Sequence, residues 1–249
     1  MNPIVIVPAR MAARRLPGKP LADIGGVAMI IRVMRCALAE GIGPVVVAAG
    51  DPEIVEVVKA AGGQAILTDP DLASGSDRIL AALAEIDPQS RHDVVINLQG
   101  DMPFAPPGLL RVCTGLLQSE DDCDIATLVA AESGSEDRSN PDVVKAVLAM
   151  DPAGDFGRAL YFTRSTLFGE GPIWRHIGLY AYRRQALMKF HTAATSPLER
   201  REGLEQLRAL ELGLLIRAAV VASAPISVDT PADLAAARAF ADSQKGEDR

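Results

Sequence analysis

The stretch IVIVPARMAARRLPGKPL, from Ile4 to Leu21, combines a buried strand with a cationic loop. Its first four residues are apolar and mostly β-branched, which predicts a strand over residues 4–7, and Pro8 ends that strand because proline cannot donate to a sheet ladder. Four cations then fall within ten residues: Arg10, Arg14, Arg15 and Lys19. Open α/β sheets bind ligands beyond the carboxyl ends of their strands, so the stretch predicts an α/β fold with a polyphosphate site in this loop.

A solvated surface loop is the alternative interpretation of these cations, because most charge runs only face water. The backbone around Lys19 favours the site, since Pro17, Gly18 and Pro20 restrict it. The loop matches neither G-x-x-x-x-G-K-[ST] nor G-x-G-x-x-G, so it gives no support to an ATPase or an NAD-dependent dehydrogenase.

Length and composition indicate one domain of ordinary size. The chain has 249 residues, 49% of them hydrophobic, so residues 1–249 are expected to form a single α/β domain. The formal net charge of -7 argues against a nucleic-acid partner, which needs a broad basic surface. Cys36, Cys113 and Cys123 form no C-x-x-C pair, which fits a reducing cytoplasm, and no stretch predicts a membrane span.

Strands and helices alternate along the next part of the chain. The predicted elements are a helix over 28–39, a strand over 45–49, a helix over 52–61 with Asp51 as its N-cap, a strand over 64–67, a helix over 79–86 and a strand over 94–98. These strands carry no polar face, which is typical of a parallel sheet with helices on both faces. We therefore predict a Rossmann-like, mostly parallel sheet.

Polar residues stand at two strand ends in this region. Ser74 or Ser76 is a candidate N-cap for the helix that follows. Asp101 follows the strand over 94–98, and Gly100 allows the backbone to approach a ligand closely. Asp101 is therefore a candidate ligand for a hard cation above phosphates, and an aspartate that caps the next loop is the alternative.

From Asp124 onward the pattern changes to strands without helices. Strand-like runs cover residues 125–130, 143–148, 159–163 and 177–182, with loops expected between them, including the polar stretch 132–140. This indicates an antiparallel lobe inserted over approximately residues 125–190. A capping box at Ser196 then predicts one helix to about Leu212, followed by a strand over 216–222 and a C-terminal helix.

The cationic loop closely resembles R-x-x-S-x-R-L-P-G-K-P-L, the signature of the CMP-Kdo synthetases, or 3-deoxy-manno-octulosonate cytidylyltransferases. The match runs from Arg10 to Leu21, with Ala13 in place of the usual serine. Further segments resemble later motifs of the family: Ser74 to Arg78, Asn97 to Pro103, Asn140 to Lys145, Tyr161 to Arg164, Arg175 to Tyr180, Leu204 to Arg208 and Val228 to Leu234. Many members have a glutamate where this chain has Met102, so no metal role is assigned to that residue.

The resemblance implies residues for each ligand of the family. For the nucleotide they are Pro8, Ala9, Arg10, Arg15, Lys19, Ser74, Gly75, Arg78 and Gln99. For the sugar acid they are Gln99, Arg164, His176, Tyr180, Glu205 and Gln206, which are expected to converge over one pocket facing Asp101. Arg10, Lys19, Asp101 and Asp229 are the expected catalytic residues, and the two aspartates are the expected ligands of Mg²⁺.

The implied reaction transfers CMP from CTP to the anomeric hydroxyl of Kdo, 3-deoxy-D-manno-octulosonate, with release of pyrophosphate, for lipopolysaccharide biosynthesis. The inserted lobe is expected to bind the sugar and to form a homodimer contact.

Several alternatives differ from this reading in substrate or in class. A related acceptor such as 8-amino-Kdo or an acylneuraminate is one, although an acylneuraminate enzyme would lack the L-P-G-K-P-L run. A metal-dependent glycosyltransferase would more often show D-x-D than Asp101-Met102-Pro103. A non-catalytic nucleotide-binding paralogue should have lost Lys19, Asp101 or Asp229, and all three are present.

Overall fold

The computed structural model describes residues 1–13, 15–120, 122–132 and 135–247, which form two compact units. The N-terminal unit comprises Asn2–His92, Asn97–Leu109 and Pro225–Arg249. The middle unit comprises Asp93–Ile96 and Leu110–Ala224, together with Met1. Each unit contains strands and helices of its own.

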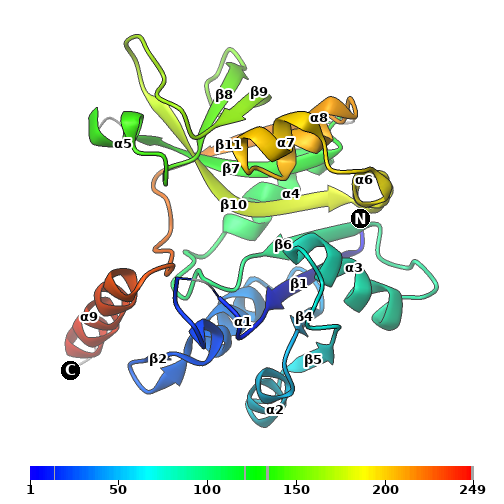
Figure 1. Ribbon diagram of the computed structural model, residues 1–249, viewed down its shortest axis with the longest axis vertical. Coiled ribbons are helices and arrows are strands. Elements are labelled where there is room, and N and C mark those ends of the chain that lie inside the picture. The colour runs from blue at the N-terminus through cyan, green and yellow to red at the C-terminus, as the bar shows by residue number, and fades with distance from the viewer. Residues whose placement is uncertain (14, 121, 133–134, 248–249) are drawn as a thin grey trace. The chain divides into compact units, whose positions relative to one another are not determined.

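Parallel strands form the sheet of the N-terminal unit, where they lie side by side in Figure 1. β1 (Pro3–Ala9) pairs with β4 (Val45–Ala49), which pairs with β5 (Gln64–Leu67). Every residue of β4 is buried, as its continuous apolar run predicts. These pairings confirm the predicted α/β fold with parallel strands.

Helices α1 (Met29–Glu40), α2 (Pro52–Ala60) and α3 (Gly75–Ile86) pack against these strands. The Ser74 hydroxyl accepts a hydrogen bond from the Asp77 N–H at 3.1 Å, and the Asp77 carboxylate accepts one from the Ser74 N–H at 3.0 Å. This capping box confirms Ser74 as the N-cap of α3.

Asp51 occupies the predicted N-cap position of α2, but its side chain does not cap the helix. Among the described residues, the Asp51 carboxylate makes no hydrogen bond to the helix that it precedes. It accepts a hydrogen bond from the Met11 N–H instead, at 2.7 Å. The loop after β1 and the start of α2 compete for the same acceptor, and folding brings the loop to it.

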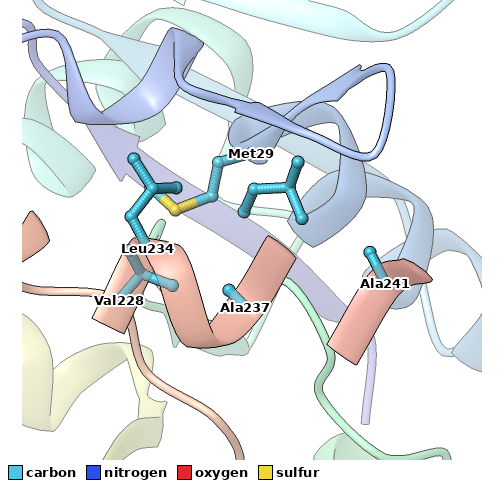
Figure 2. Close-up of a cluster of buried hydrophobic side chains, with 6 residues drawn as sticks. Met29, Val228, Leu234, Ala237 and Ala241 are labelled. Atoms are coloured by element: carbon cyan, nitrogen blue, oxygen red, sulfur yellow. The ribbon is translucent and has the colours of Figure 1, made fainter. Parts of the chain in front are cut away.

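The C-terminal helix α9 (Pro231–Glu247) packs beside β2 (Asp23–Ile24), which pairs with β3 (Val27–Ala28). Figure 2 shows the hydrophobic cluster that joins them, with Val228 and Leu234 beside Met29. The cluster consists of Ile24, Met29, Val228, Leu234, Ala237 and Ala241. Because burial of apolar surface is worth about 25 cal/mol per Å², this cluster fixes the segment that begins at Val228.

The middle unit has a mixed sheet in the order β10-β7-β11-β9-β8. Its strands are β7 (Ile125–Glu132), β8 (Lys145–Met150), β9 (Phe156–Thr163), β10 (Ile173–Arg183) and β11 (Ile216–Val221). The antiparallel strands predicted here are confirmed, while β7 and β11 pair in parallel. The remaining predicted strand, over 94–98, is present as β6 (Val94–Leu98).

The helices of the middle unit depart from the sequence prediction at four places. α4 (Leu109–Ser119) and α6 (Arg184–Thr192) have no counterpart in it, and α5 (Ser135–Ser139) lies where only a loop was expected. The single helix predicted from Ser196 to Leu212 is two, α7 (Pro197–Glu202) and α8 (Gln206–Glu211), which lie side by side in Figure 1. Gly203 separates them because its left-handed backbone, with φ at 65°, ends α7.

Replacing Gly203 with alanine should lower the free energy of unfolding by about 1 kcal/mol, because an L residue is strained in the left-handed region. No atom lies within 4 Å of the added Cβ, so backbone conformation is the cause rather than a clash. Urea unfolding followed by circular dichroism measures the change. Gly115→Ala in α4, where the added Cβ also meets no atom within 4 Å, is the matched control and should be neutral or stabilising. Equal stability of the two variants would show that an L residue at position 203 is not strained.

Candidate active site

The loop after β1 is organised around the peptide groups of Met11. Its carbonyl accepts hydrogen bonds from the N–H groups of Ala13 at 2.8 Å and Gly18 at 3.0 Å. Gly18 has φ at 72°, which lets the chain turn into the short 3₁₀ helix η1 (Lys19–Leu21). The motif P-G-K-P therefore sets the direction in which the Lys19 side chain leaves the backbone.

An open pocket of about 270 Å³ lies between this loop, the start of α3 and the end of β6. Nearly all the residues expected to bind the nucleotide line it: Pro8, Ala9, Arg10, Lys19, Ser74, Gly75, Arg78 and Gln99. Ala12, Ala13, Pro20, Gly100 and Asp101 complete the lining. Sequence segments separated by up to 93 positions therefore meet at one place in the N-terminal unit.

Lys19 holds together the two aspartates expected to bind a metal. Its Nζ donates to Asp101 Oδ2 at 3.1 Å and to Asp229 Oδ1 at 3.0 Å. The Lys19 side chain is 16% exposed and that of Asp101 is 21% exposed, so solvent screens this pair much less than an ordinary surface ion pair. The cluster lies entirely within the N-terminal unit.

Burial and charge oppose each other in this cluster. Burial acts to lower the pKa of Lys19, but the carboxylates of Asp101 and Asp229 raise it above its ordinary value. Burial raises the pKa of Asp101, against the effect of the Lys19 ammonium. The Lys19 ammonium and the carboxylates each stabilise the charged form of the other, against the effect of burial. A cation is therefore required beside the two carboxylates.

Backbone contacts bring Asp229 to Asp101 although 128 positions separate them in the sequence. The Val228 N–H donates to the Asp101 carbonyl at 2.9 Å. The Asp233 carboxylate accepts from the N–H groups of Asp229 and Thr230, at 3.0 Å and 2.8 Å. The cluster in Figure 2 then anchors Val228 itself, so the position of Asp229 depends on the packing of α9.

The pair of carboxylates suits Mg²⁺. Within the described ranges of the chain, no group of three or more His, Cys, Asp or Glu side chains could hold a metal. Mg²⁺ usually takes one or two protein carboxylates and keeps several waters, so Asp101 and Asp229 are a sufficient set. The Lys19 ammonium marks the point at which both carboxylates reach a cation.

The other expected phosphate ligands differ in their surroundings. Arg15 pairs with Asp229 at 3.1 Å, and its side chain is 56% exposed. Arg10 lines the pocket, while Arg14 lies outside the described residues. Arg78 is buried, and its guanidinium donates to the Thr68 hydroxyl and to the carbonyls of the adjoining loop.

The residues expected to bind the sugar lie in the middle unit, except Gln99, which donates to Asn97 at 3.0 Å in the N-terminal unit. The rings of His176 and Tyr180 have their centroids 5.3 Å apart. Burial, and then the nearby charge of Glu205, raises the pKa of Tyr180. Gln206 begins α8 and is buried. The structure thus brings His176, Tyr180 and Glu205 together.

Burial lowers the pKa of His176 to about 3. Its Nε2 lies within hydrogen-bond distance of the Thr127 hydroxyl, at 3.1 Å. The same hydroxyl lies 2.9 Å from the Leu179 carbonyl and 3.2 Å from the Ile177 carbonyl. Thr127 therefore links the His176 ring to the backbone of β10.

Arg164, directly after β9, is held through its backbone by two charged side chains, of which Lys145 is buried and Glu202 is 11% exposed. Its N–H donates to Glu202 Oε2 at 3.2 Å, and its carbonyl accepts from Lys145 Nζ at 2.8 Å. Its guanidinium donates to the Pro141 carbonyl at 2.9 Å. Side chains from β8 and α7 therefore fix the backbone of Arg164, the arginine expected to bind the sugar.

Several residues that fix this geometry have no role in the sequence prediction. They are Thr127, Lys145 and Glu202 in the middle unit, Asp233 beside Asp229, and Asp51, which was assigned only as a cap. A carboxylate directly after a buried strand was a usable signal at Asp51. Asp233 follows Thr230 at the spacing of a capping box, which was also a usable local signal. Thr127, Lys145 and Glu202 bind backbone groups that folding brings to them from distant segments, so their sequence context carries no signal.

Comparison with known proteins places this geometry in a family. Residues 4–216 match the family model described as cytidylyltransferase. The protein of Parvibaculum lavamentivorans named 3-deoxy-manno-octulosonate cytidylyltransferase is 54% identical over 239 residues, which cover 96% of this chain and 92% of that protein. The protein of the same name from Rhodospirillum rubrum is also 54% identical, over 96% of this chain and 95% of its own length.

Solved structures agree with these relatives. A structure of CMP:2-keto-3-deoxy-manno-octonic acid synthetase complexed with CTP superposes with a TM-score of 0.89 at 36% identity, covering 98% of this chain and 100% of that one. A 4-diphosphocytidyl-2C-methyl-D-erythritol synthase from Anaerococcus prevotii has a TM-score of 0.64 at 12% identity over 96% and 97% of the two chains, a likeness of fold alone. With the loop motif, the pocket and full-length relatives in agreement, this chain belongs to the family of 3-deoxy-manno-octulosonate cytidylyltransferases.

Proposed function

We propose that this protein transfers CMP from CTP to the anomeric hydroxyl of Kdo and releases pyrophosphate. One observation carries the proposal: Lys19, which lines the pocket together with Arg10, contacts both Asp101 and Asp229. Curated relatives 51% to 54% identical, all named for this activity, support Kdo over a related sugar acid.

The reaction forms one bond to phosphorus and breaks another. The sugar hydroxyl attacks the α-phosphorus of CTP, and the bond from that phosphorus to the oxygen bridging to the β-phosphate breaks, so pyrophosphate leaves. The protein's task is to position the reactants and to stabilise charge. At an effective dielectric of about 20, one cation 4 Å from a phosphate charge contributes about 4 kcal/mol before desolvation costs. Arg10, Arg15 and Lys19 are the cations for this task.

The proposed metal is Mg²⁺, held by Asp101 and Asp229. When bound it would neutralise phosphate charge and orient the triphosphate for displacement of pyrophosphate. Lys19 supplies positive charge at the same point of the pocket, since its ammonium touches both carboxylates. Gly100 lets the chain after β6 approach β1 closely at this point, because a Cβ there would lie 2.9 Å from the Pro8 carbonyl oxygen.

Binding of the sugar acid is proposed for Arg164, His176, Tyr180, Glu205 and Gln206, together with Gln99. Kdo carries a carboxylate next to its anomeric carbon, and a guanidinium suits a planar carboxylate better than an ammonium does. A ring nitrogen of His176 can form a hydrogen bond with a sugar hydroxyl.

We also propose a homodimer in the cytoplasm. Leu160 on β9 is 49% exposed and Phe168, beyond it, is 93% exposed, which supports a partner surface on the middle unit. All three cysteines are free thiols, which supports a reducing compartment. Within the described part of the chain, no helix is long and apolar enough to cross a membrane.

The purified protein should release pyrophosphate from CTP only when both Mg²⁺ and Kdo are present. A coupled pyrophosphate assay with Kdo, 8-amino-Kdo and N-acetylneuraminate compares the acceptors, and chromatography identifies the CMP-sugar. Release without any sugar acid would indicate a CTP hydrolase. Faster turnover with N-acetylneuraminate than with Kdo would contradict Kdo as the acceptor.

Asp101→Asn and Asp229→Asn should each lower turnover by about two to three orders of magnitude, because each removes one charge from the proposed Mg²⁺ site. Steady-state kinetics over a range of Mg²⁺ concentrations measures the loss, and circular dichroism checks the fold. Asp71→Asn, on an exposed loop of the same unit, is the matched control and should behave as the wild type. Turnover within a few-fold of wild type in either variant would refute the metal assignment.

Arg164→Lys should raise the Michaelis constant for Kdo by about tenfold and leave that for CTP nearly unchanged, because the charge stays but bidentate geometry is lost. Initial rates with each substrate varied in turn separate the two constants. Arg158→Lys, at an exposed position on the same strand β9, is the control. A change in neither constant, or an equal change in both, would remove Arg164 from the sugar site.

A further inference from the structure

Asp51 lies at the end of β4, where α2 begins, but its carboxylate serves another segment. Oδ2 accepts the hydrogen bond of the Met11 N–H at 2.7 Å, across 40 positions of sequence. This bond is shorter than an ordinary N–H···O bond, as is usual for an ionised acceptor. The described residues that line the pocket do not include Asp51.

The Met11 peptide groups connect Asp51 to the phosphate loop, residues 10–19. The carbonyl of Met11 accepts from the Gly18 N–H at 3.0 Å, and Gly18 directly precedes Lys19. The Met11 side chain lies next to Gly18, where an added Cβ would be 3.7 Å from it. Two hydrogen bonds therefore link the Asp51 carboxylate to the residue before the lysine that reaches both metal carboxylates.

A carboxylate at position 51 has to be explained, because negative charge near a triphosphate site opposes binding of the anion. One candidate reason is charge balance. Burial and the nearby Arg10 lower the pKa of Arg78, and the charge of Asp51 acts in the opposite direction. The other reason is geometric, since the loop folds back on itself at Met11 and its N–H needs an acceptor there.

We propose that Asp51 is a positioning residue that holds the phosphate loop in its CTP-binding conformation through the hydrogen bond to the Met11 N–H. The proposal rests on the proposed function for its ligand, CTP. The hydrogen bond rather than the charge carries the effect, so an amide oxygen at this position should preserve it.

The test compares Asp51→Ala, which removes the acceptor, with Asp51→Asn, which keeps an oxygen and removes the charge. Calorimetric titration should show that Asp51→Ala weakens CTP binding about tenfold and CMP binding less, since the loop's cations are placed for the outer phosphates. Asp51→Asn should bind CTP at least as tightly as wild type. Asp151→Ala is the matched control, because Asp151 also accepts turn N–H groups, at 3.0 Å and 3.1 Å, but lies in the middle unit. It should leave CTP binding unchanged.

Hydrogen exchange of the ligand-free protein tests the loop without reference to CTP. Asp51→Ala should speed exchange at the amides of Met11, Ala13 and Gly18, and Asp51→Asn should not. If wild type binds no CTP while exchange behaves as expected, the proposed function fails and the positioning role stands. Unchanged exchange in Asp51→Ala would overturn the proposal. Equal weakening of CTP binding by both variants would overturn it in favour of charge balance.

Discussion

The contact on which the site depends is the ammonium of Lys19 shared by Asp101 and Asp229. Two aspartates this close repel each other, and burial raises the pKa of Asp101 further, so the pair needs a cation between them. Lys19 fills that need in the protein, and the proposed Mg²⁺ would use the same two carboxylates. The arrangement explains why the motif P-G-K-P, a strand end and the start of α9 must all meet within one unit.

The supports of this contact are backbone bonds and apolar packing. The Val228 N–H reaches the Asp101 carbonyl, and the cluster of Figure 2 holds Val228 against Met29. In the middle unit, the side chains of Lys145 and Glu202 bind the carbonyl and the N–H of Arg164. Burial and the charge of Arg164 lower the pKa of Lys145. In both units, charged side chains bind backbone groups, which fixes loops that carry functional residues.

The sequence anticipated the elements whose signals are local. Strands β4, β5 and β6 follow from continuous apolar runs, and Ser74 is one of the two serines predicted as a possible N-cap. It failed where two local signals conflicted or where none existed. The run after Ser196 has one continuous apolar stripe, but Gly203 divides it into two helices. Asp51 precedes α2, but its carboxylate accepts a hydrogen bond from the distant Met11 N–H.

By itself the sequence determined the family, through motifs spread from Pro8 to Leu234, and the residue types at the site, because a phosphate pocket needs cations and carboxylates in recognisable contexts. Only the tertiary structure decided which of these side chains meet. It joined Asp229 to Asp101, brought the Thr127 hydroxyl to the His176 ring and turned Asp51 toward Met11. The physical reason is that these contacts join residues 40 to 210 positions apart, and no local propensity encodes a distance that the packing of whole elements sets.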